Sequence, residues 1–384
     1  MLVYIGTYTH GASEGVYACR FDPARGTFDD LRVAARLRTP TFMAADPAQR
    51  HLYVGHDGAD GPDGMISAYA IDATTGALSP LGALPTHGRS PCHVSVDATG
   101  HCAVVANYHG EGGPGSVAVF RVERGGGLAE AAVLRHEGSS LHMERQSCPH
   151  PHSANIDPTN RCVLVPDLGL DQVVVYRMDA ARAALTRPSA AQVEAGSGPR
   201  HLAFHPSGRW AYVLNELGNT IMAFAWDATA GELRHLQTLP TLPAGFTGRS
   251  ACADVHVHPS GRFVYGSNRG HDSIAIFAAD SATGRLTPLG QEPTGGRNPR
   301  NFAIDPSGAY LLAANQDTDN IVTFRIDADA GRLLPTGQVT QAPAPVCILM
   351  LPRAGTGRRY YTSQPERTAQ ISAPEIVSRR SRQK

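Results

Sequence analysis

The 384-residue sequence has no apolar run that approaches the ~20 residues needed to span a bilayer. It also has no net charge, because 34 Lys and Arg residues balance 34 Asp and Glu residues. No overall electrostatic attraction to nucleic acid or to an anionic membrane is therefore expected. The opening residues, MLVYIGTYTHGASEGVY, lack a basic segment followed by a long apolar one, so no signal peptide is predicted.

The seven cysteines are odd in number and include no CxxC pair. This pattern argues against a disulfide framework and against a zinc ribbon. A reducing cytoplasm is the predicted location. The sequence is instead rich in Gly (40) and Pro (28), a composition that suits a turn-rich, all-β protein.

Six segments repeat one pattern: an Asp or His, a short turn, and an apolar strand. They are DPAQRHLYVGHDG from residue 46, DATGHCAVVANYHG from 97, DPTNRCVLVPDLG from 157, HPSGRWAYVLNELG from 205, HPSGRFVYGSNRG from 258 and DPSGAYLLAANQD from 305. A short apolar segment precedes each copy, and a third strand and a turn into a fourth follow it. Four strands in ~50 residues, repeated along the chain, are typical of a β-propeller.

The two ends of the repeat region complement each other. The N-terminal LVYIGTYTHGASEGVYACRFD matches a second and a third strand, and PVCILML at 345–351 is a lone first strand. Joined, they complete a seventh blade and leave no open edge. The sequence thus predicts an all-β, seven-bladed propeller over residues 1–352. Residues 353–384, with eight Arg or Lys against two Glu, are expected to form a poorly ordered basic tail.

Equivalent positions that keep one residue type in every repeat build the blades, whereas positions that vary in type can have a functional role. Two sets of such variable positions are expected at one mouth of the central channel. The starts of the first strands supply His152, Arg200, Arg300, His201 and Asp254, and the ends of the second strands supply Glu216 and Arg269. Arginines hold small anions bidentately, and a carboxylate or imidazole can move a proton. Asn268 belongs to a neighbouring set of equivalent positions that are mostly Asn. This pattern indicates side chains that hydrogen-bond the backbone of their own turn.

Two other interpretations of these residues remain open. Arg200–Glu216 and Asp254–Arg269 can be ion pairs that tie neighbouring blades together. His150 and His152 form an HxH pair of the kind that binds metal, but no third ligand accompanies them. No metal and no cofactor are therefore predicted.

Four segments carry a family resemblance: PHPHSANIDPTNRCVLVPDLGLDQVVVY, GPRHLAFHPSGRWAYVLNELGNT, DVHVHPSGRFVYGSNRGHDSIAIF and GRNPRNFAIDPSGAYLLAANQDTDNI. With them the chain resembles the seven-bladed lactonase propellers from about residue 2 to 352. That family includes propeller-type 6-phosphogluconolactonases and the carboxy-cis,cis-muconate lactonising enzyme. The resemblance implies that His152, Arg200, Glu216 and Arg269 are catalytic. Asp254 stands where many relatives carry Glu.

The expected function is metal-independent hydrolysis of an anionic sugar lactone such as 6-phosphogluconolactone. Glu216 or His152 would be the general base and the other would protonate the leaving oxygen. Substrate-binding residues would be Arg300, Asp254, His201 and Asn268. The alternatives are a muconate-type lactonising cyclase on the same site and a non-catalytic binding or scaffold propeller. The predicted partner is a small anionic lactone or carboxylate, with no nucleic acid or membrane, and the protein is expected to be a monomer or weak homodimer.

Overall fold

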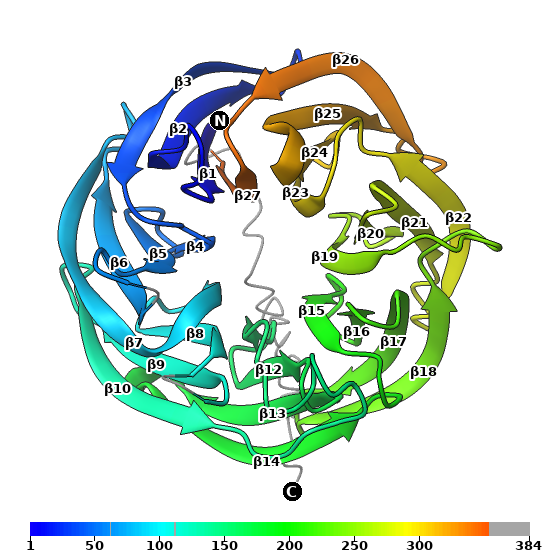
Figure 1. Cartoon of the computed structure of the whole chain (residues 1–384), viewed down its shortest axis with the longest axis horizontal. Helices are drawn as coiled ribbons and strands as arrows, with labels where there is room; N and C mark the ends of the chain where they lie inside the picture. The colour runs from blue at the N-terminus through cyan, green and yellow to red at the C-terminus, as the bar shows by residue number, and fades with distance from the viewer. Residues whose placement is uncertain (62, 111–112, 353–384) are drawn as a thin grey trace, which may run out of the picture.

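The computed structural model describes residues 1–352 except 62 and 111–112. Its sheets radiate from a common centre, as Figure 1 shows. In this part of the chain the only helices are two short 3-10 turns, η1 (Ala180–Arg182) and η2 (Gln316–Thr318). The predicted basic tail, 353–384, lies outside the described residues. No helix among the described residues is long and apolar enough to cross a membrane.

The strands form six sheets. The first contains β27 (Pro345–Leu351), β1 (Leu2–Thr7), β2 (Gly15–Asp22) and β3 (Thr27–Arg36). The second contains β4 (Phe42–Ala45), β5 (His51–Asp57), β6 (Asp63–Ile71), β7 (Leu78–Val96), β8 (Cys102–His109), β9 (Ser116–Val122) and β10 (Leu128–Arg135). The third contains β11 (Asn155–Ile156), β12 (Cys162–Asp167), β13 (Gln172–Asp179) and β14 (Ala184–Gln192).

The remaining three sheets have four strands each. They are β15 (Pro199–Phe204), β16 (Trp210–Asn215), β17 (Thr220–Asp227) and β18 (Glu232–Pro240); then β19 (Ala251–Val257), β20 (Phe263–Arg269), β21 (Ser273–Ala279) and β22 (Leu286–Pro293); then β23 (Pro299–Ile304), β24 (Tyr310–Asn315), β25 (Asn320–Ile326) and β26 (Leu333–Gln341).

Strand β7 belongs to two blades. Its first part, from Leu78 to Arg89, pairs with β6, and its second part, from Arg89 to Val96, pairs with β8. Between them the chain turns where His87 and Ser90 take positive φ angles. The seven-stranded sheet is therefore two blades joined by one continuous strand. With the five four-stranded sheets, the described residues form seven blades, as predicted.

The ends of the described chain meet in one blade. Strand β27 pairs antiparallel with β1, so that Ile5 lies opposite Ile348. Figure 1 shows β27 at the centre beside β1. The prediction that the lone C-terminal strand completes the N-terminal blade is confirmed at the level of strand pairing.

The repeated Asp or His stabilises the turn between the first two strands of a blade. Asp157 Oδ1 accepts hydrogen bonds from the backbone N–H groups of Arg161 (2.8 Å) and Cys162 (2.7 Å). Where His replaces Asp, the imidazole reaches the next blade: His258 Nε2 donates to Gly308 O (2.9 Å). A Cβ at position 308 would lie 2.4 Å from that nitrogen, and φ there is +78°, so only glycine fits. His258 therefore has a structural role.

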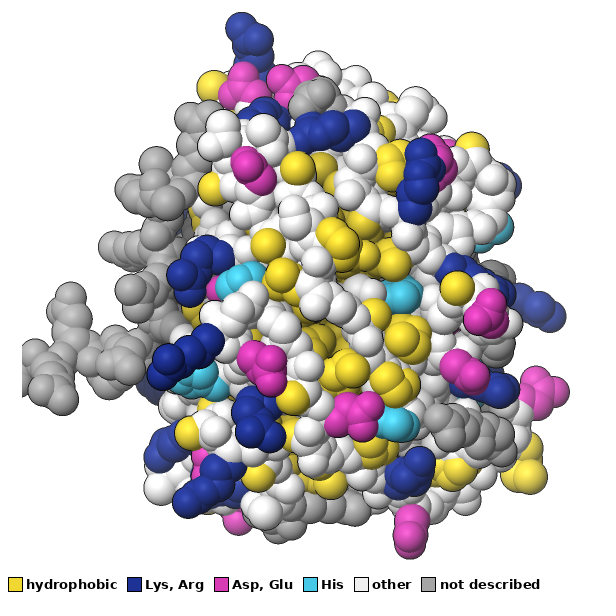
Figure 2. Space-filling model, turned by 90° about the vertical axis from the view of Figure 1, so that its left-hand side faces the viewer, with side chains coloured by type: hydrophobic (Ala, Val, Ile, Leu, Met, Phe, Trp, Pro, Cys, Tyr) yellow, Lys and Arg dark blue, Asp and Glu magenta, His cyan; other side chains and the backbone are white. Residues whose placement is uncertain are grey.

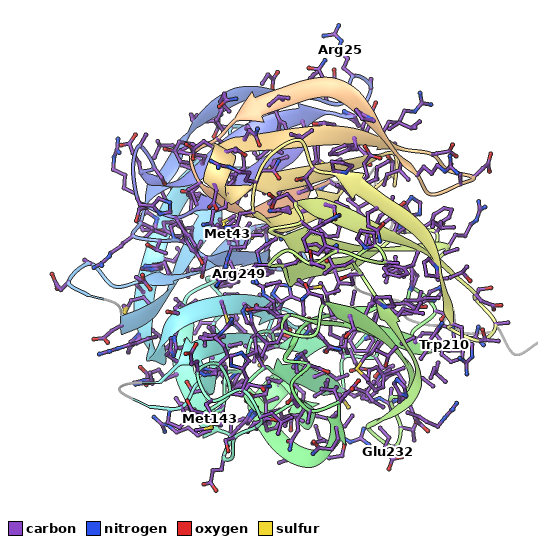
Figure 3. All side chains as sticks on the ribbon, turned by 45° about the vertical axis from the view of Figure 1, so that its right-hand side comes forward. Arg25, Met43, Met143, Trp210, Glu232 and Arg249 are labelled. Carbon is purple, nitrogen blue, oxygen red and sulfur yellow. The ribbon has the colours of Figure 1, made fainter. Side chains whose placement is uncertain are left out.

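The core lies between neighbouring blades, where buried side chains of one sheet contact those of the next. One such cluster joins the first and the last blade through Ile5, Leu312 and Ile348. Figure 3 labels Met43 near the middle of the ring, on the innermost strand β4, whereas Arg25 projects from the outer rim. On the side shown in Figure 2, basic and acidic side chains are interspersed, in line with the balanced charge of the sequence.

The β1–β27 contact should contribute strongly to stability. Ile5 is fully buried, so Ile5→Ala should lower the free energy of unfolding by about 2–5 kcal/mol through lost burial and a residual cavity. Leu334 is 46% exposed, and Leu334→Ala should change it by no more than about 0.5 kcal/mol. Urea unfolding followed by circular dichroism measures both. Equal, small effects would show that this blade does not share the cooperative core.

Candidate active site at the channel mouth

Irregular pairing at the starts of the inner strands places the site residues. In a regular strand, neighbouring side chains point to opposite faces. The β15–β16 register shifts between Pro199 and His201, and the β23–β24 register shifts likewise between Pro299 and Asn301. Such a bulge re-aims side chains. Arg200 and His201, although adjacent, are accordingly both buried and both line the same cavity.

Glu216 is the centre of the cluster. Its Oε2 accepts a hydrogen bond from Arg200 Nε (2.9 Å) and lies 3.0 Å from Arg269 Nη2. Its Oε1 accepts from Arg145 Nη2 (2.5 Å), and His152 Nε2 lies 3.8 Å from Oε2. Three of the four residues predicted as catalytic thus converge on the fourth. We call Arg145, His152, Arg200, Glu216 and Arg269 the mouth cluster.

Charge neighbours set the protonation of this cluster. Burial alone would raise the pKa of Glu216, but its arginine partners, Arg269 foremost, lower it to about 2. Burial and the charges of Arg269 and Arg300 lower the pKa of Arg200 to about 10. Glu216 is therefore a carboxylate held by arginines at neutral pH.

Arg145 was not predicted from the sequence. It lies in the loop between β10 and β11, outside the repeated pattern, and also donates to Tyr108 Oη (3.2 Å). The signal was the spacing of the repeats: the copies at residues 97 and 157 are 60 apart, against 47 to 53 for the others. The extra length forms the loop that carries Arg145 to the site.

Asp254 holds a second network on the channel wall. His201 Nδ1 donates to its Oδ1 (2.8 Å), and its Oδ2 accepts from His256 Nε2 (3.0 Å) and Asn301 Nδ2 (2.5 Å). Burial would raise the pKa of Asp254, but His256 and His201 hold it well below its ordinary value. His256 shows the converse effect: burial opposes its charge, but Asp254 raises its pKa.

Two imidazoles at the site keep a nitrogen without a partner. His152 Nδ1 and His201 Nε2 are both buried and have no hydrogen-bond partner among the described residues. Their rings are 5.6 Å apart, edge to face. Burial and the charge of Arg200 lower the pKa of His152 well below its ordinary value and that of His201 to about 4. Both rings are neutral at physiological pH, and the free nitrogen of each can accept a proton or form a hydrogen bond with a ligand.

Arg300 lies on the same cavity as His201 and Asn301. Its guanidinium carbon is 5.3 Å from the centre of the Tyr8 ring, a cation–π arrangement. No acceptor for its N–H groups occurs among the described residues. The predicted substrate-binding residues Arg300, His201 and Asp254 are thus close to the mouth cluster.

Asn268 does not join this site. It is fully buried, and its Nδ2 donates to Thr241 O and to Ser273 Oγ (both 3.2 Å). Asn107 and Asn315 make equivalent bonds in other blades. A substrate would have to break these hydrogen bonds, so the structure favours a structural role for this Asn position over substrate binding.

The predicted ion pairs between blades need correction. Arg200 and Glu216 do pair, but within one blade, since β15 and β16 are neighbours in one sheet. Arg269 pairs with Glu216 instead of Asp254, because Asp254 is occupied by two histidines. Of these two arginine–Glu216 pairs, Arg269–Glu216 is the one that crosses between blades.

The two histidines of the HxH pair have different surroundings. His150 stacks on Tyr108 and its Nδ1 lies 2.8 Å from Tyr108 O, whereas His152 faces Glu216. In the part of the chain that the structure describes, no group of three His, Cys, Asp or Glu side chains is arranged for a metal ion.

A serine motif occurs away from this network. Gly11 to Gly15 read G-x-S-x-G. They lie in the hairpin between β1 and β2, and Ser13 Oγ lies 2.5 Å from Thr7 Oγ1. A nucleophile elbow needs a strand-to-helix turn and a His partner. This motif lies in a strand-to-strand hairpin, and no His among the described residues is hydrogen-bonded to Ser13.

The arginine contacts make Glu216 a pH-dependent source of stability. Its folded pKa, about 2, is below the ordinary value of 4.5. Its contribution is therefore fully present above pH 4.5 and is lost as the pH falls toward about 2. Glu216→Gln should lower the free energy of unfolding by about 3–5 kcal/mol at neutral pH, and the difference from wild type should shrink below pH 4.5.

Glu232→Gln is the matched control. Glu232 is exposed at the start of β18 and is labelled in Figure 3. Its substitution should change stability little at any pH. Urea unfolding at several pH values measures both variants. A Glu216→Gln effect that did not depend on pH would contradict the charge argument.

Comparison with known proteins shows the family of the chain. The family model for "Lactonase, 7-bladed beta-propeller" matches residues 2–350. The chain is 40% identical over 303 residues to a 6-phosphogluconolactonase of Bacillus subtilis, covering 79% of this chain and 84% of that protein. It is 33% identical over 310 residues to a 6-phosphogluconolactonase of Formosa agariphila, covering 79% and 86%.

A solved structure shares the whole architecture. The periplasmic gluconolactonase of Pseudomonas aeruginosa superposes with a TM-score of 0.86 at 35% identity, covering 92% of this chain and all of that one. The chain belongs to the seven-bladed β-propeller lactonase family.

Proposed function

We propose that the protein hydrolyses an anionic sugar lactone, 6-phosphogluconolactone, to the open acid at the mouth cluster. The observation that carries this proposal is the set of arginines around Glu216, next to two neutral imidazoles with unpartnered nitrogens. Family membership and the names of the relatives support the reaction class.

The reaction adds one water to the lactone carbonyl. A base removes a proton from the water as its oxygen attacks the carbonyl carbon. The carbonyl oxygen becomes an oxyanion, which Arg200 and Arg269 stabilise. The bond from the carbonyl carbon to the ring oxygen then breaks, and the ring oxygen takes a proton to become a hydroxyl.

The structure supports His152 over Glu216 as the base. Glu216 has a pKa of about 2 and its oxygens are occupied by arginines, so it is a weak base and a strong anchor. His152 is neutral and keeps Nδ1 available. A bound anion would offset the charges of Arg200 and Arg300, which lower the pKa of His152, and would strengthen His152 as a base.

His201 supports the substrate from the channel wall. Asp254 fixes its tautomer by accepting from Nδ1, which leaves the lone pair of Nε2 directed away from Asp254. We assign His201 to the lactone hydroxyls or to the attacking water, with Asp254 as the residue that positions it.

Further expectations from the sequence belong to the same proposal. The β1–β27 pairing would leave the ring without an open edge. The chemistry would need no metal. The cytoplasmic location and the monomeric or weakly dimeric state stay predictions.

A turnover assay tests the proposal. The protein should hydrolyse 6-phosphogluconolactone well above the spontaneous rate and should act poorly on carboxymuconolactone. Treatment with EDTA should leave the rate and the melting temperature unchanged. Preference for the muconolactone would favour the cyclase, turnover with neither substrate would favour the scaffold, and loss with EDTA would overturn metal independence.

Substitution of His152 tests the base. His152→Gln should lower kcat by about 10²–10⁴-fold while binding of 6-phosphogluconate, measured by calorimetry, changes little. His150→Gln is the control, because both nitrogens of His150 already have partners, Tyr108 O and Cys148 Sγ. Equal losses in the two variants would argue against His152.

The pH profile tests the same assignment independently. The pKa of His152 is well below 6.5, so the free protein keeps the base form across neutral pH. A plot of kcat/KM against pH should therefore show no fall with an apparent pKa near 6.5. A fall in that range would point to a different, ordinary histidine.

A further inference from the structure

The arginines of the site differ in how many of their donors are already used. Arg200 donates from Nε to Glu216 and from Nη1 to Ala253 O. Arg269 donates from Nε to Ala251 O (3.4 Å) and from Nη2 to Cys252 O (3.0 Å). Both side chains are largely buried, at 3% and 17% exposure. The blades thus hold these two arginines in place.

Arg145 and Arg300 keep most of their donors available. Arg145 uses Nη2 toward Glu216 and Tyr108, and its Nε and Nη1 have no acceptor among the described residues. Its side chain is 38% exposed, so it faces the solvent side of the mouth. Arg300 lies half-buried over Tyr8 with no acceptor among the described residues. A planar guanidinium with free donors is suited to phosphate or carboxylate oxygens.

The charges at the mouth are out of balance. Arg145, Arg200 and Arg269 contact one carboxylate, Glu216, and Arg300 adds a fourth positive charge. Asp254 adds only one further negative charge, so four arginines face two carboxylates, Glu216 and Asp254. A lactone ring is neutral, whereas a phosphate monoester carries about −1.5 to −2 at pH 7. The surplus therefore fits a phosphorylated substrate better than an unphosphorylated one.

The loop that carries Arg145 is anchored on both sides of its exposed part, so the position of Arg145 is well defined. His136 at its start contacts Asp167 (2.5 Å) and Tyr176 Oη (2.7 Å), and Gln146 donates to Leu168 O (2.8 Å). Between the anchors the loop reaches solvent, since Met143 is 79% exposed. Figure 3 labels Met143 away from the centre of the ring. The backbone next to Arg145 is thus held in place, while its side chain is partly exposed to solvent.

We propose that Arg145, together with Arg300, binds the phosphate of the substrate and sets the preference for phosphorylated over unphosphorylated lactones. This inference rests on the proposed lactonase function. Arg200 and Arg269 then serve the lactone carbonyl, and Arg145 and Arg300 serve the distant phosphate. Arg145 is a specificity-determining residue supplied from outside the propeller repeat.

Calorimetric titration with 6-phosphogluconate and with gluconate tests the assignment, alongside kcat/KM for the two corresponding lactones. Arg145→Met removes the charge and the donors but keeps much of the side-chain length. A charged hydrogen bond contributes about 1.5–3 kcal/mol, so the variant should lose about 10- to 150-fold more affinity for 6-phosphogluconate than for gluconate. The kcat/KM ratio of the two lactones should fall to a similar extent.

Two further variants sharpen the result. Arg124→Met removes an exposed arginine from the turn between β9 and β10, and should change neither ligand's binding. Arg145→Lys keeps the charge but loses the planar donors, and should fall between Arg145→Met and wild type.

Each outcome separates the inference from the proposed function. If Arg145→Met lowers affinity for both ligands equally, or for neither, the phosphate assignment is overturned and Arg145 only positions Glu216. If the wild-type protein binds neither ligand, the assignment fails as well. If it binds 6-phosphogluconate with the expected Arg145 dependence but hydrolyses no lactone, the proposed function fails and the phosphate site stands.

Discussion

The contact between Glu216 and its arginines is the interaction on which the site depends. Arg145, Arg200 and Arg269 come from a loop and two different blades and all lie within 3.0 Å of one carboxylate. Without that carboxylate, mutual repulsion would separate these guanidinium groups, of which those of Arg200 and Arg269 are largely buried, because charges interact strongly away from water. Glu216 therefore brings together the arginines of the proposed anion site, although its low pKa makes it a poor base.

The propeller supplies two conditions that this arrangement needs. The antiparallel order within a blade brings the start of an inner strand and the end of its neighbour to one mouth, as β15 and β16 do for Arg200 and Glu216. The bulge at Pro199 then allows two consecutive residues to line the cavity. The same bulge recurs in β23, which places Arg300 and Asn301. Because the hydrogen-bonded strands fix these positions, the charged side chains need little rearrangement to meet a ligand.

Two carboxylates of the channel have different partners and so different roles. Glu216 balances arginines, whereas Asp254 balances His256 and orients His201. The unpartnered nitrogens of His152 and His201 lie between these networks, with their rings 5.6 Å apart. Cys92 lines the same cavity, but burial raises its pKa to about 12, so its thiol stays protonated and inert.

The repeated turn pattern determined the blade architecture and the pairing of the chain ends, because each blade is built from local, sequence-adjacent strands whose turns carry their own residue signals. Comparison between repeats also identified His152, Arg200, Glu216 and Arg269, since these positions depart from the repeat. Only the tertiary structure decided which charges meet. Arg269 pairs with Glu216 of the preceding blade instead of Asp254. Asn268 forms its hydrogen bonds within its own blade. Arg145 reaches Glu216 from a loop outside the repeated pattern. Partner choice depends on distances across blades and on which donors are already occupied, and neither quantity is encoded in a local pattern.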